Sequence, residues 1–411
     1  MKRTESGGAV ESRIFPTLVD LFCGAGGLSL GLSRSGLRPI HAVDHFSTAV
    51  DTYSQNIDRH VERAEVSRDT NLPSATVYAG GPPCQGFSSA GKRRNGDKRN
   101  SLVGVFADLI ARHRPRAFVF ENVEGFLTTE GGQRVLDLLN PLIDAGYLIH
   151  LRKINAANFG VPQHRKRVVA IGGLGWEPAF PEPTHFAFGA PGASLLGHDL
   201  SKTPTLMECI HDLPTPSVSE RDAPLPDHFY RQLTGIDLER AALLESGQTM
   251  RDLPESLWHP SYQRRANRRV MDGTPTERRG GAPSGVRRLN PDEPSKAITG
   301  SARNEFIHPT DLRTLTLREC ARLQTFPDDF LFVGTVAERA TLIGNAVPPL
   351  LAFSIGTSIV DSLRETKTEQ DTPGKLLSFV PTASNGMSPS LQKTTEMVKQ
   401  RFGLMSSRES T

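Results

Sequence analysis

The segment 80–88, Gly-Gly-Pro-Pro-Cys-Gln-Gly-Phe-Ser, restricts the possible folds more than any other part of this sequence. It follows the apolar, β-prone run 75–79, which predicts a buried strand. The two glycines and two prolines end that strand and exclude a helix. Cys84 is therefore expected on a stiff turn just past the carboxyl end of a strand, where open α/β sheets bind ligands. From this segment alone, Cys84 is either a small apolar residue of the turn or a nucleophile.

An earlier part of the chain predicts a nucleotide-binding unit of the Rossmann-like α/β type. Residues 17–22 read as an apolar strand, 23–27 as a glycine-rich turn, and 28–32 as the start of a helix. The helix N-terminus offers free N–H groups to a carboxylate or a phosphate. Asp44 ends the next strand, 39–43, at a spacing that suits a ribose hydroxyl pair. We therefore expect an adenosine-bearing ligand, and both NAD and S-adenosylmethionine satisfy this pattern.

A carboxylate ends another predicted buried strand. Glu121 directly follows the apolar run 117–120, so it also lies at the carboxyl edge of the sheet. If the two strands are neighbours, Glu121 lies beside Cys84. A nucleophilic thiol and a carboxylic acid form a workable pair for addition to an electron-poor ring.

Alternating polar residues precede a further predicted strand, 168–172. Gln163, Arg165 and Arg167 project to the same side of it, because successive side chains in a strand alternate. They are either an exposed basic start to the strand or cationic groups for a phosphodiester or a polarised carbonyl.

Basic residues concentrate in two segments. Residues 88–100 carry five positive charges against one negative, which fits a solvated loop or a mobile lid, and the position beside Cys84 favours the lid. Residues 251–290 hold nine arginines and four acids, and this local charge of +5 exceeds the +3 of the whole chain. The cluster is a salt-bridged or solvated face, or else a surface that tracks phosphates and reads bases, which the asymmetry favours. The candidate nucleic-acid contacts in the two segments are Ser88, Lys92, Arg94, Arg264, Arg265, Arg268, Arg269, Arg287 and Arg288.

The composition argues against several other classes of protein. The chain of 411 residues is 37% hydrophobic and 23% charged, as in soluble globular proteins with two or three domains. No apolar run approaches the roughly 20 residues of a membrane span, and we expect no secretory peptide. The four cysteines are scattered without a Cys-x-x-Cys pair, which argues against a disulfide framework or a zinc site and favours a reducing cytoplasm. No cluster of ligands suggests any other metal, so we expect none.

Six sequence blocks, in this order and spacing, resemble the cytosine-C5 DNA methyltransferase family, in its bacterial type II modification form. The blocks are Phe22-x-Gly24-x-Gly26-Gly27, Pro83-Cys84-Gln85, Glu121-Asn122-Val123, Gln163-x-Arg165-x-Arg167, the run 317–327 and the run 343–349. The resemblance covers about residues 17–173 and 294–357. It implies a Rossmann-like S-adenosylmethionine-dependent methyltransferase domain with a smaller, irregular target-recognition domain.

The resemblance also implies how the chain is divided. A flexible leader, 1–15, precedes the first part of the catalytic domain, 16–175. The recognition domain follows at 176–293, and the chain returns to the catalytic domain at 294–365. Residues 366–411 lie outside the resemblance and are rich in Lys, Glu, Thr, Ser and Pro, so we expect them to be mostly disordered.

The implied chemistry is covalent. Cys84 adds to carbon 6 of cytosine, which makes carbon 5 nucleophilic enough to take a methyl group. Glu121 stabilises the ring at nitrogen 3, Arg165 faces the ring carbonyl, and Arg167 completes the catalytic set. The target base must flip out of the duplex. Flipping costs a few kcal/mol, which contacts with the protein offset.

The implied methyl donor is S-adenosylmethionine. Phe22 packs on its adenine, Asp44 binds the ribose, and Glu65 or Asp69 contacts the adenine amine. The other implied cofactor residues are Asp20, Gly24, Gly26, Gly27, Pro82, Leu102, Asn345 and Val347. Gln163 and Thr299, which lies on a threonine-bearing strand at the domain junction, join the residues expected to contact DNA.

Three other functions remain open from the sequence. One is an RNA cytosine-C5 methyltransferase of the tRNA-modifying type, and another is a DNA-binding regulator that has lost catalysis. A dinucleotide oxidoreductase fits the first strand–turn–helix unit only. For the methyltransferase, we expect a monomer that acts on duplex DNA in a prokaryotic cytoplasm, associated with the nucleoid. It is either paired with a cognate restriction endonuclease or solitary, and the sequence fits both.

Overall fold

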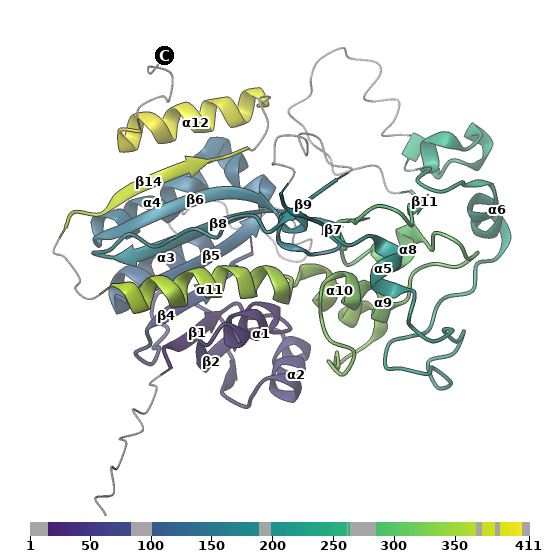
Figure 1. Ribbon diagram of the computed structural model, residues 1–411, viewed down its shortest axis with the longest axis horizontal. Coiled ribbons are helices and arrows are strands. Elements are labelled where there is room, and N and C mark those ends of the chain that lie inside the picture. Colours follow the sequence, from purple (N-terminus) through teal and green to yellow (C-terminus); the bar gives the residue numbers. More distant parts are fainter. Residues whose placement is uncertain are drawn as a thin grey trace, which may run out of the picture.

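An eight-stranded sheet forms the centre of the computed structural model (Figure 1). The structure describes residues 15–83, 101–188, 199–260, 262–263, 285–366, 372–382 and 387–404. The strands lie in the order β14-β6-β8-β5-β4-β1-β2-β3. Their bounds are β1 (Thr17–Leu21), β2 (Arg38–Asp44), β3 (Val61–Arg63), β4 (Val77–Gly80), β5 (Ala117–Val123), β6 (Tyr147–Asn155), β8 (Lys166–Leu174) and β14 (Lys375–Val380).

The central strands are apolar on both faces, so helices must cover both faces of the sheet. On one side α3 (Leu102–His113) and α4 (Gln133–Asp144) share a core with the sheet. On the other side α1 (Gly27–Arg34) and α11 (Pro349–Glu365) do the same, and Figure 1 shows α11 lying along the sheet beside α1. The chain also forms α2 (Ser47–Asn56) next to β2 and β3. This layering confirms the predicted α/β class.

The order of the strands creates a ligand site at one edge of the sheet. Strands β1 to β5 are parallel, whereas β8 runs antiparallel to both β5 and β6. After β1 the chain moves through β2 to β3, then returns to β4 on the other side of β1. The order therefore reverses between β1 and β4, and such switch points bind ligands beyond the carboxyl ends of the strands.

The helical stretch Val336–Glu365 is long and apolar enough to cross a membrane by length and composition. It contains α10 (Val336–Asn345) and α11, and 67% of its most apolar window is buried inside the protein. Close packing explains this burial, because a Cβ on Gly31 of α1 would lie 2.2 Å from the Pro349 carbonyl oxygen. We therefore interpret the stretch as a pair of core helices.

Residues 176–293 separate the two parts of the chain that form the main sheet and its covering helices. Where this region is described, it has little regular structure. Near its C-terminal end, β11 (Arg287–Arg288) pairs in parallel with β13 (Phe306–Ile307). Residues 306–307 therefore belong structurally with residues 287–288, beyond the boundary at 293 that the sequence suggested. The short elements of residues 124–323 are η1 (Glu124–Leu127), η2 (Thr129–Gly132), η3 (Ala156–Phe159), β7 (Gln163–His164), β9 (His185–Phe186), β10 (Ser201–Lys202), α5 (Leu206–Ile210), α6 (Gly235–Leu243), η5 (Met250–Asp252), η6 (Glu255–Leu257), β11 (Arg287–Arg288), β12 (Ser295–Lys296), α8 (Ala302–Glu305), β13 (Phe306–Ile307) and α9 (Leu317–Leu323).

The C-terminal segment corrects the prediction of a mostly disordered tail. Within 366–411, β14 pairs in parallel with β6 at the edge of the sheet, and α12 (Pro389–Phe402) packs against η2. Figure 1 shows α12 beside β14. The reason lies in a few apolar positions that the polar composition conceals: Leu376 of β14, together with Leu391 and Val398 of α12, joins the core beneath α4. A short strand and one amphipathic helix are enough to order a polar segment when an existing core receives them.

We expect Leu391→Ala to lower the free energy of unfolding by about 2–4 kcal/mol, because it removes a buried side chain from the core. Lys393→Ala on the exposed face of α12 is the matched control and should change this free energy by less than about 0.5 kcal/mol. Urea unfolding measures both. Equal stability of the two variants would show that α12 does not dock on the core.

Candidate active site

The carboxyl ends of β4 and β5 bring the predicted catalytic segments together. Glu121 lies beside the turn that leads to Cys84, since a Cβ on Gly81 would be 3.2 Å from the Glu121 Oε2. The next residue fastens the turn, because the Asn122 Nδ2 donates a hydrogen bond to the Pro82 carbonyl oxygen at 2.9 Å. Cys84 itself lies outside the described residues. The chain that carries it leaves the sheet next to Glu121.

Glu121 forms a buried ion pair with Arg167. The Arg167 Nε lies 2.7 Å from the Glu121 Oε1, and the two side chains are 13% and 9% exposed. Sheet register brings them together: Glu121 is opposite Val169, so Arg167, two residues earlier on β8, faces the same side. Burial lowers the pKa of Arg167, and Glu121 opposes that shift. Arg167 therefore holds the carboxyl group in one orientation at the edge of the sheet.

Arg165 does not lie where the sequence placed it. We expected it to face the ring carbonyl of the base, but its guanidinium is 1% exposed and donates hydrogen bonds to three backbone carbonyls. The acceptors are the oxygens of Ile298 at 2.7 Å, Gly344 at 2.8 Å and Ala346 at 2.9 Å. Alternation along the strand puts Arg165 and Arg167 on the same side of an ideal strand, but β7 ends before Arg165 and β8 begins after it. The break turns one arginine into the interior.

Gln163 is likewise buried and does not face DNA as predicted. Its Oε1 accepts a hydrogen bond from the Ile298 N–H at 2.9 Å. Its Nε2 donates to the Leu323 carbonyl oxygen at 2.7 Å and to the Gln324 Oε1 at 2.8 Å. Thr299, the next residue after the segment that Gln163 holds, is exposed, as a DNA contact requires. Sequence alternation gave no signal for these long-range partners.

The glycine-rich turn after β1 has a backbone built for a ligand. Phe22, Gly24 and Gly26 all have positive φ angles, of 60°, 54° and 89°, and Phe22 is strained there because it has a side chain. The Gly24 N–H donates to the Asp44 Oδ2 at 2.9 Å, while the Asp44 Oδ1 accepts from the Phe46 N–H at 2.9 Å. Asp44 thus fixes the turn to the end of β2, at the switch point of the sheet.

The last sequence block reaches this turn from the far end of the chain. A Cβ on Gly27 would lie 2.3 Å from the Val347 carbonyl oxygen, so only glycine permits the contact. Val347 is buried, and Asn345 is exposed beside it. The outer side of the turn is open, since a Cβ on Gly24 would meet no atom within 4 Å. Helix α1 has Gly26 as its N-cap and therefore no side-chain cap, so its first N–H groups are available to an anionic group.

The remaining predicted cofactor residues lie near the same edge. Pro82 is buried beneath the turn after β4, and Leu102 begins α3, which the Ser101 side chain caps. Glu65 and Asp69 are both exposed, and neither has a geometry that selects it over the other for the adenine amine. These assignments therefore remain predictions.

A buried polar chain runs behind the turn, and sequence analysis missed it. The Asp20 Oδ2 accepts from the Ser29 Oγ at 2.7 Å, the Tyr53 hydroxyl donates to the same Oγ at 3.0 Å, and the His60 Nε2 lies 3.0 Å from that hydroxyl. Asp20 is fully buried, and its Oδ1 has no hydrogen-bond partner. Burial raises the pKa of Asp20 to about 7, and the nearby Asp44 adds to the rise. In the sequence, Ser29 follows Asp20 at an ordinary spacing. Only the packing of α1 beside β1 brings the two side chains together.

The raised pKa of Asp20 predicts a pH-dependent stability in the free protein. The folded state binds the proton more tightly than the unfolded state, so the stabilisation is complete below about pH 4 and is lost as the pH rises to about 7. Asp20→Asn removes this dependence because it does not titrate. Urea unfolding of both proteins between pH 4 and 8 should show the wild type losing up to about 4 kcal/mol relative to the variant. A constant difference would mean that Asp20 does not titrate there.

Arg288 is also inside the protein, which corrects its prediction as a DNA contact. It is 7% exposed and donates to the carbonyl oxygens of Leu244 and Ala241, each at 2.8 Å, and of His308 at 2.7 Å. A guanidinium can satisfy several carbonyls at once, which makes it a good centre for a region with little regular structure. Arg287, its neighbour on β11, is partly exposed and remains a candidate.

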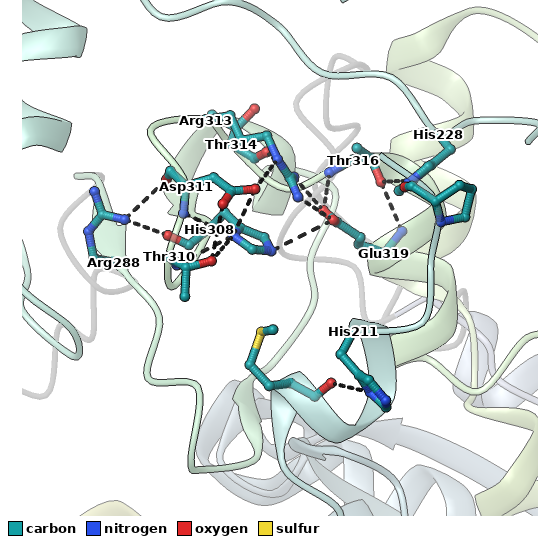
Figure 2. Close-up of polar contacts among 12 residues, drawn as sticks. His211, His228, Arg288, His308, Thr310, Asp311, Arg313, Thr314, Thr316 and Glu319 are labelled. Carbon is teal, nitrogen blue, oxygen red and sulfur yellow. Dashed lines mark hydrogen bonds and ion pairs between the residues drawn. The ribbon is translucent and has the colours of Figure 1, made fainter. Parts of the chain in front are cut away.

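A charged cluster joins this irregular region to α9. Arg313 binds Glu319 through two hydrogen bonds, of 3.0 and 2.8 Å, and the His308 Nε2 lies 3.9 Å from the same carboxylate. Figure 2 shows the Arg313 guanidinium and the His308 ring directed toward Glu319, with Asp311 on the other side of His308. Glu319 also accepts from the Thr316 N–H in a capping box at the start of α9. Several charges of the region therefore serve its own architecture, which charge counting cannot distinguish from DNA contacts.

Several predicted residues lie outside the described residues, so the structure places none of them. They are Cys84, Ser88, Lys92, Arg94, Arg264, Arg265, Arg268 and Arg269.

The sheet has one reversed strand and a glycine turn fixed by Asp44 at its switch point, and the Glu121 carboxylate lies at the end of β5 beside Gly81. This arrangement fits a methyltransferase that uses S-adenosylmethionine. Comparison with known proteins agrees. A family model for C-5 cytosine-specific DNA methylases matches residues 17–361. The chain belongs to this family and is a DNA cytosine-5-methyltransferase of the type II class.

Individual relatives extend over most of the chain. The type II methyltransferase M1.HphI of Haemophilus parahaemolyticus is 34% identical over 84% of this chain and 86% of its own length. The type II methyltransferase M.AgeI of Thalassovita gelatinovora is 30% identical over 83% of this chain and 98% of its own. A solved structure of a prophage-encoded Escherichia coli protein described as a DNA modification methyltransferase covers 85% of this chain and 99% of its own, with a TM-score of 0.61 and 24% identity, and shows a shared fold.

The residues at the switch point fit S-adenosylmethionine. Asp44 and the open turn at Gly24 suit an adenosine group, and the uncapped start of α1 suits the carboxylate of its methionine part.

Proposed function

We propose that this enzyme methylates carbon 5 of a flipped-out cytosine in a specific duplex DNA sequence through a covalent bond between Cys84 and carbon 6. The observation that carries the proposal is the pair of Glu121 and Arg167 beside Gly81, where the chain leaves the sheet toward Cys84. An oriented, buried carboxyl group next to Gly81, three residues before Cys84, supports the proposal. Thiol and carboxyl group are the two groups that the reaction needs.

The chemistry assigns each group a separate task. The Cys84 thiolate adds to carbon 6, and the electron pair of the broken ring double bond makes carbon 5 an enamine carbon. Glu121, protonated or sharing a proton with nitrogen 3 in the complex, stabilises the ring at nitrogen 3, where negative charge would otherwise collect. Carbon 5 then takes the methyl group that S-adenosylmethionine supplies. Loss of the proton from carbon 5 to a base, for which a water suffices, restores the double bond and releases Cys84 as the leaving group.

The irregular region 176–293, with the arginines that remain candidates, is the proposed target-recognition domain. Its charge and the exposed Thr299 at its junction support contact with DNA phosphates and bases. The type II names of the relatives support a role beside a cognate restriction endonuclease. We propose that the enzyme is a monomer and works in a prokaryotic cytoplasm, at the nucleoid.

Duplex DNA that contains 5-fluorocytosine tests the covalent step. Fluorine at carbon 5 cannot leave as a proton does, so the adduct should persist after methyl transfer. A mixed-sequence duplex with all its cytosines replaced includes the unknown target. We expect a protein–DNA band that survives denaturing electrophoresis and forms only when S-adenosylmethionine is added. Methylation of ordinary duplex DNA without any such band would contradict the covalent route.

A further inference from the structure

Two segments distant in sequence meet at the site, and both touch functional parts of the protein. Residues 344–347 contact the cofactor turn through Gly27, as described above. They also contact the domain junction, because a Cβ on Gly344 would lie 2.2 Å from the Gly300 N and 2.3 Å from the Thr299 carbonyl carbon. The end of α10 and the two residues after it therefore lie between the cofactor turn and the threonine expected to meet DNA.

The Arg165 guanidinium joins these two segments directly. One terminal nitrogen bonds the Ile298 carbonyl on the junction side, and the other bonds the carbonyls of Gly344 and Ala346 on the cofactor side. No carboxylate is bonded to the guanidinium in the described residues, and its Nε is buried without a partner. A buried cation held by carbonyls alone is costly, so a role in fixing those carbonyls accounts for its presence.

A pair of glutamines completes the arrangement. Gln163 accepts from the Ile298 N–H and donates to Gln324, whose Nε2 donates to the Ile343 carbonyl oxygen at 2.5 Å. Ile298 is thus held through its N–H by Gln163 and through its carbonyl by Arg165. Both glutamines are fully buried, so solvent does not compete for these bonds.

We propose that Arg165 and Gln163 are positioning residues that hold the cofactor-facing segment 344–347 and the junction at Thr299 in a fixed relation, rather than groups that touch the base. The role of Thr299 as a DNA contact rests on the proposed function, whereas the hydrogen bonds of Arg165 and Gln163 do not depend on it. Lysine cannot replace Arg165, because a single ammonium lacks the planar fork that reaches both segments at once.

The test compares Arg165→Lys with Arg167→Lys, a matched control two residues away. Arg167 bonds Glu121 instead of the two segments. Amide hydrogen exchange of the free protein is read at 297–301 and 343–348. We expect Arg165→Lys to speed exchange in both segments by about tenfold, and Arg167→Lys to leave them as in the wild type. Calorimetric titration with S-adenosylmethionine, without DNA, should show the dissociation constant rising about tenfold for Arg165→Lys only.

The outcomes distinguish a positioning role of Arg165 from contact between Arg165 and the base. If Arg165→Lys keeps wild-type exchange and cofactor affinity and only methyl transfer is impaired, the proposal is wrong. Arg165 would then contact the base, as the sequence predicted. Should Arg165→Lys fail to fold, Gln163→Met is the second test. It keeps the side-chain volume but loses the hydrogen bonds to Ile298 and Gln324. Amide exchange should then speed up more at 297–301 than at 343–348. Because neither measurement uses DNA, a failure of the proposed methylation would leave this result unaffected.

Discussion

Cys84→Ala is expected to lower methyl transfer to DNA by about 10⁴-fold or more, because no other group can form the bond to carbon 6. Binding of S-adenosylmethionine and of DNA should stay within a few fold of the wild type, since the thiol acts only in the chemical step. Transfer of a labelled methyl group under single-turnover conditions measures the loss, and titrations of each ligand measure the binding.

The matched control is Cys209→Ala. Burial raises the pKa of the Cys209 thiol to about 12, so it stays protonated near neutral pH and is a poor nucleophile. This variant should retain transfer within about twofold. Substantial activity in Cys84→Ala would remove the nucleophile from the account and with it the covalent route.

Glu121→Gln should lower the rate of the chemical step by about 10²–10⁴-fold. The amide keeps the shape of the side chain but loses the charge that Arg167 holds and the proton that a carboxyl group shares with nitrogen 3. Cofactor affinity should change little, because Asp44 and the glycine turn do not contact this group. Rapid-quench measurement of methyl transfer gives the rate without the contribution of product release.

Glu124→Gln provides the comparison for Glu121. Glu124 lies three residues further along, and its carboxylate pairs with the Lys153 ammonium at 2.7 Å outside the site. Loss of this partly exposed pair should cost less than about 1 kcal/mol in stability and should leave the chemical step unchanged. If both variants lose the same activity, the effect belongs to the segment as a whole and not to the carboxyl group of Glu121.

Much of the site was predictable because strand ends and glycine turns have local signals. The run before Gly80 and the run before Glu121 are apolar and short, so both ends fall at one edge of a parallel sheet, where the structure places them. Asp44 was predicted from spacing in the same way. These residues owe their positions to backbone rules that act within about 20 residues.

The arginines were harder, since their partners are distant in the chain. Arg165 bonds carbonyls more than 130 residues away, and Arg288 bonds carbonyls of loops on either side of it. A charge count treats a guanidinium that organises a core and one that meets phosphate as equal. The sequence put Arg167 in the catalytic set without a partner, and the register between β5 and β8 is what brings it to Glu121.

The prediction for the C-terminal segment was wrong for a different reason. Its average composition is polar, and composition outweighed the alternation around Leu376 and the spacing of Leu391 and Val398. Whether such sparse apolar positions order a chain depends on a receiving surface, here β6 and η2, which local sequence does not reveal.

The most direct test of the central claim is methyl transfer from labelled S-adenosylmethionine to mixed-sequence duplex DNA, with transfer RNA in parallel and bisulfite sequencing of the product. The account predicts label in 5-methylcytosine at one short motif of the duplex and none in the RNA. Label confined to the RNA would contradict the DNA assignment and support the tRNA-modifying function. No label in either polymer, with DNA still bound, would identify a binding protein without catalysis.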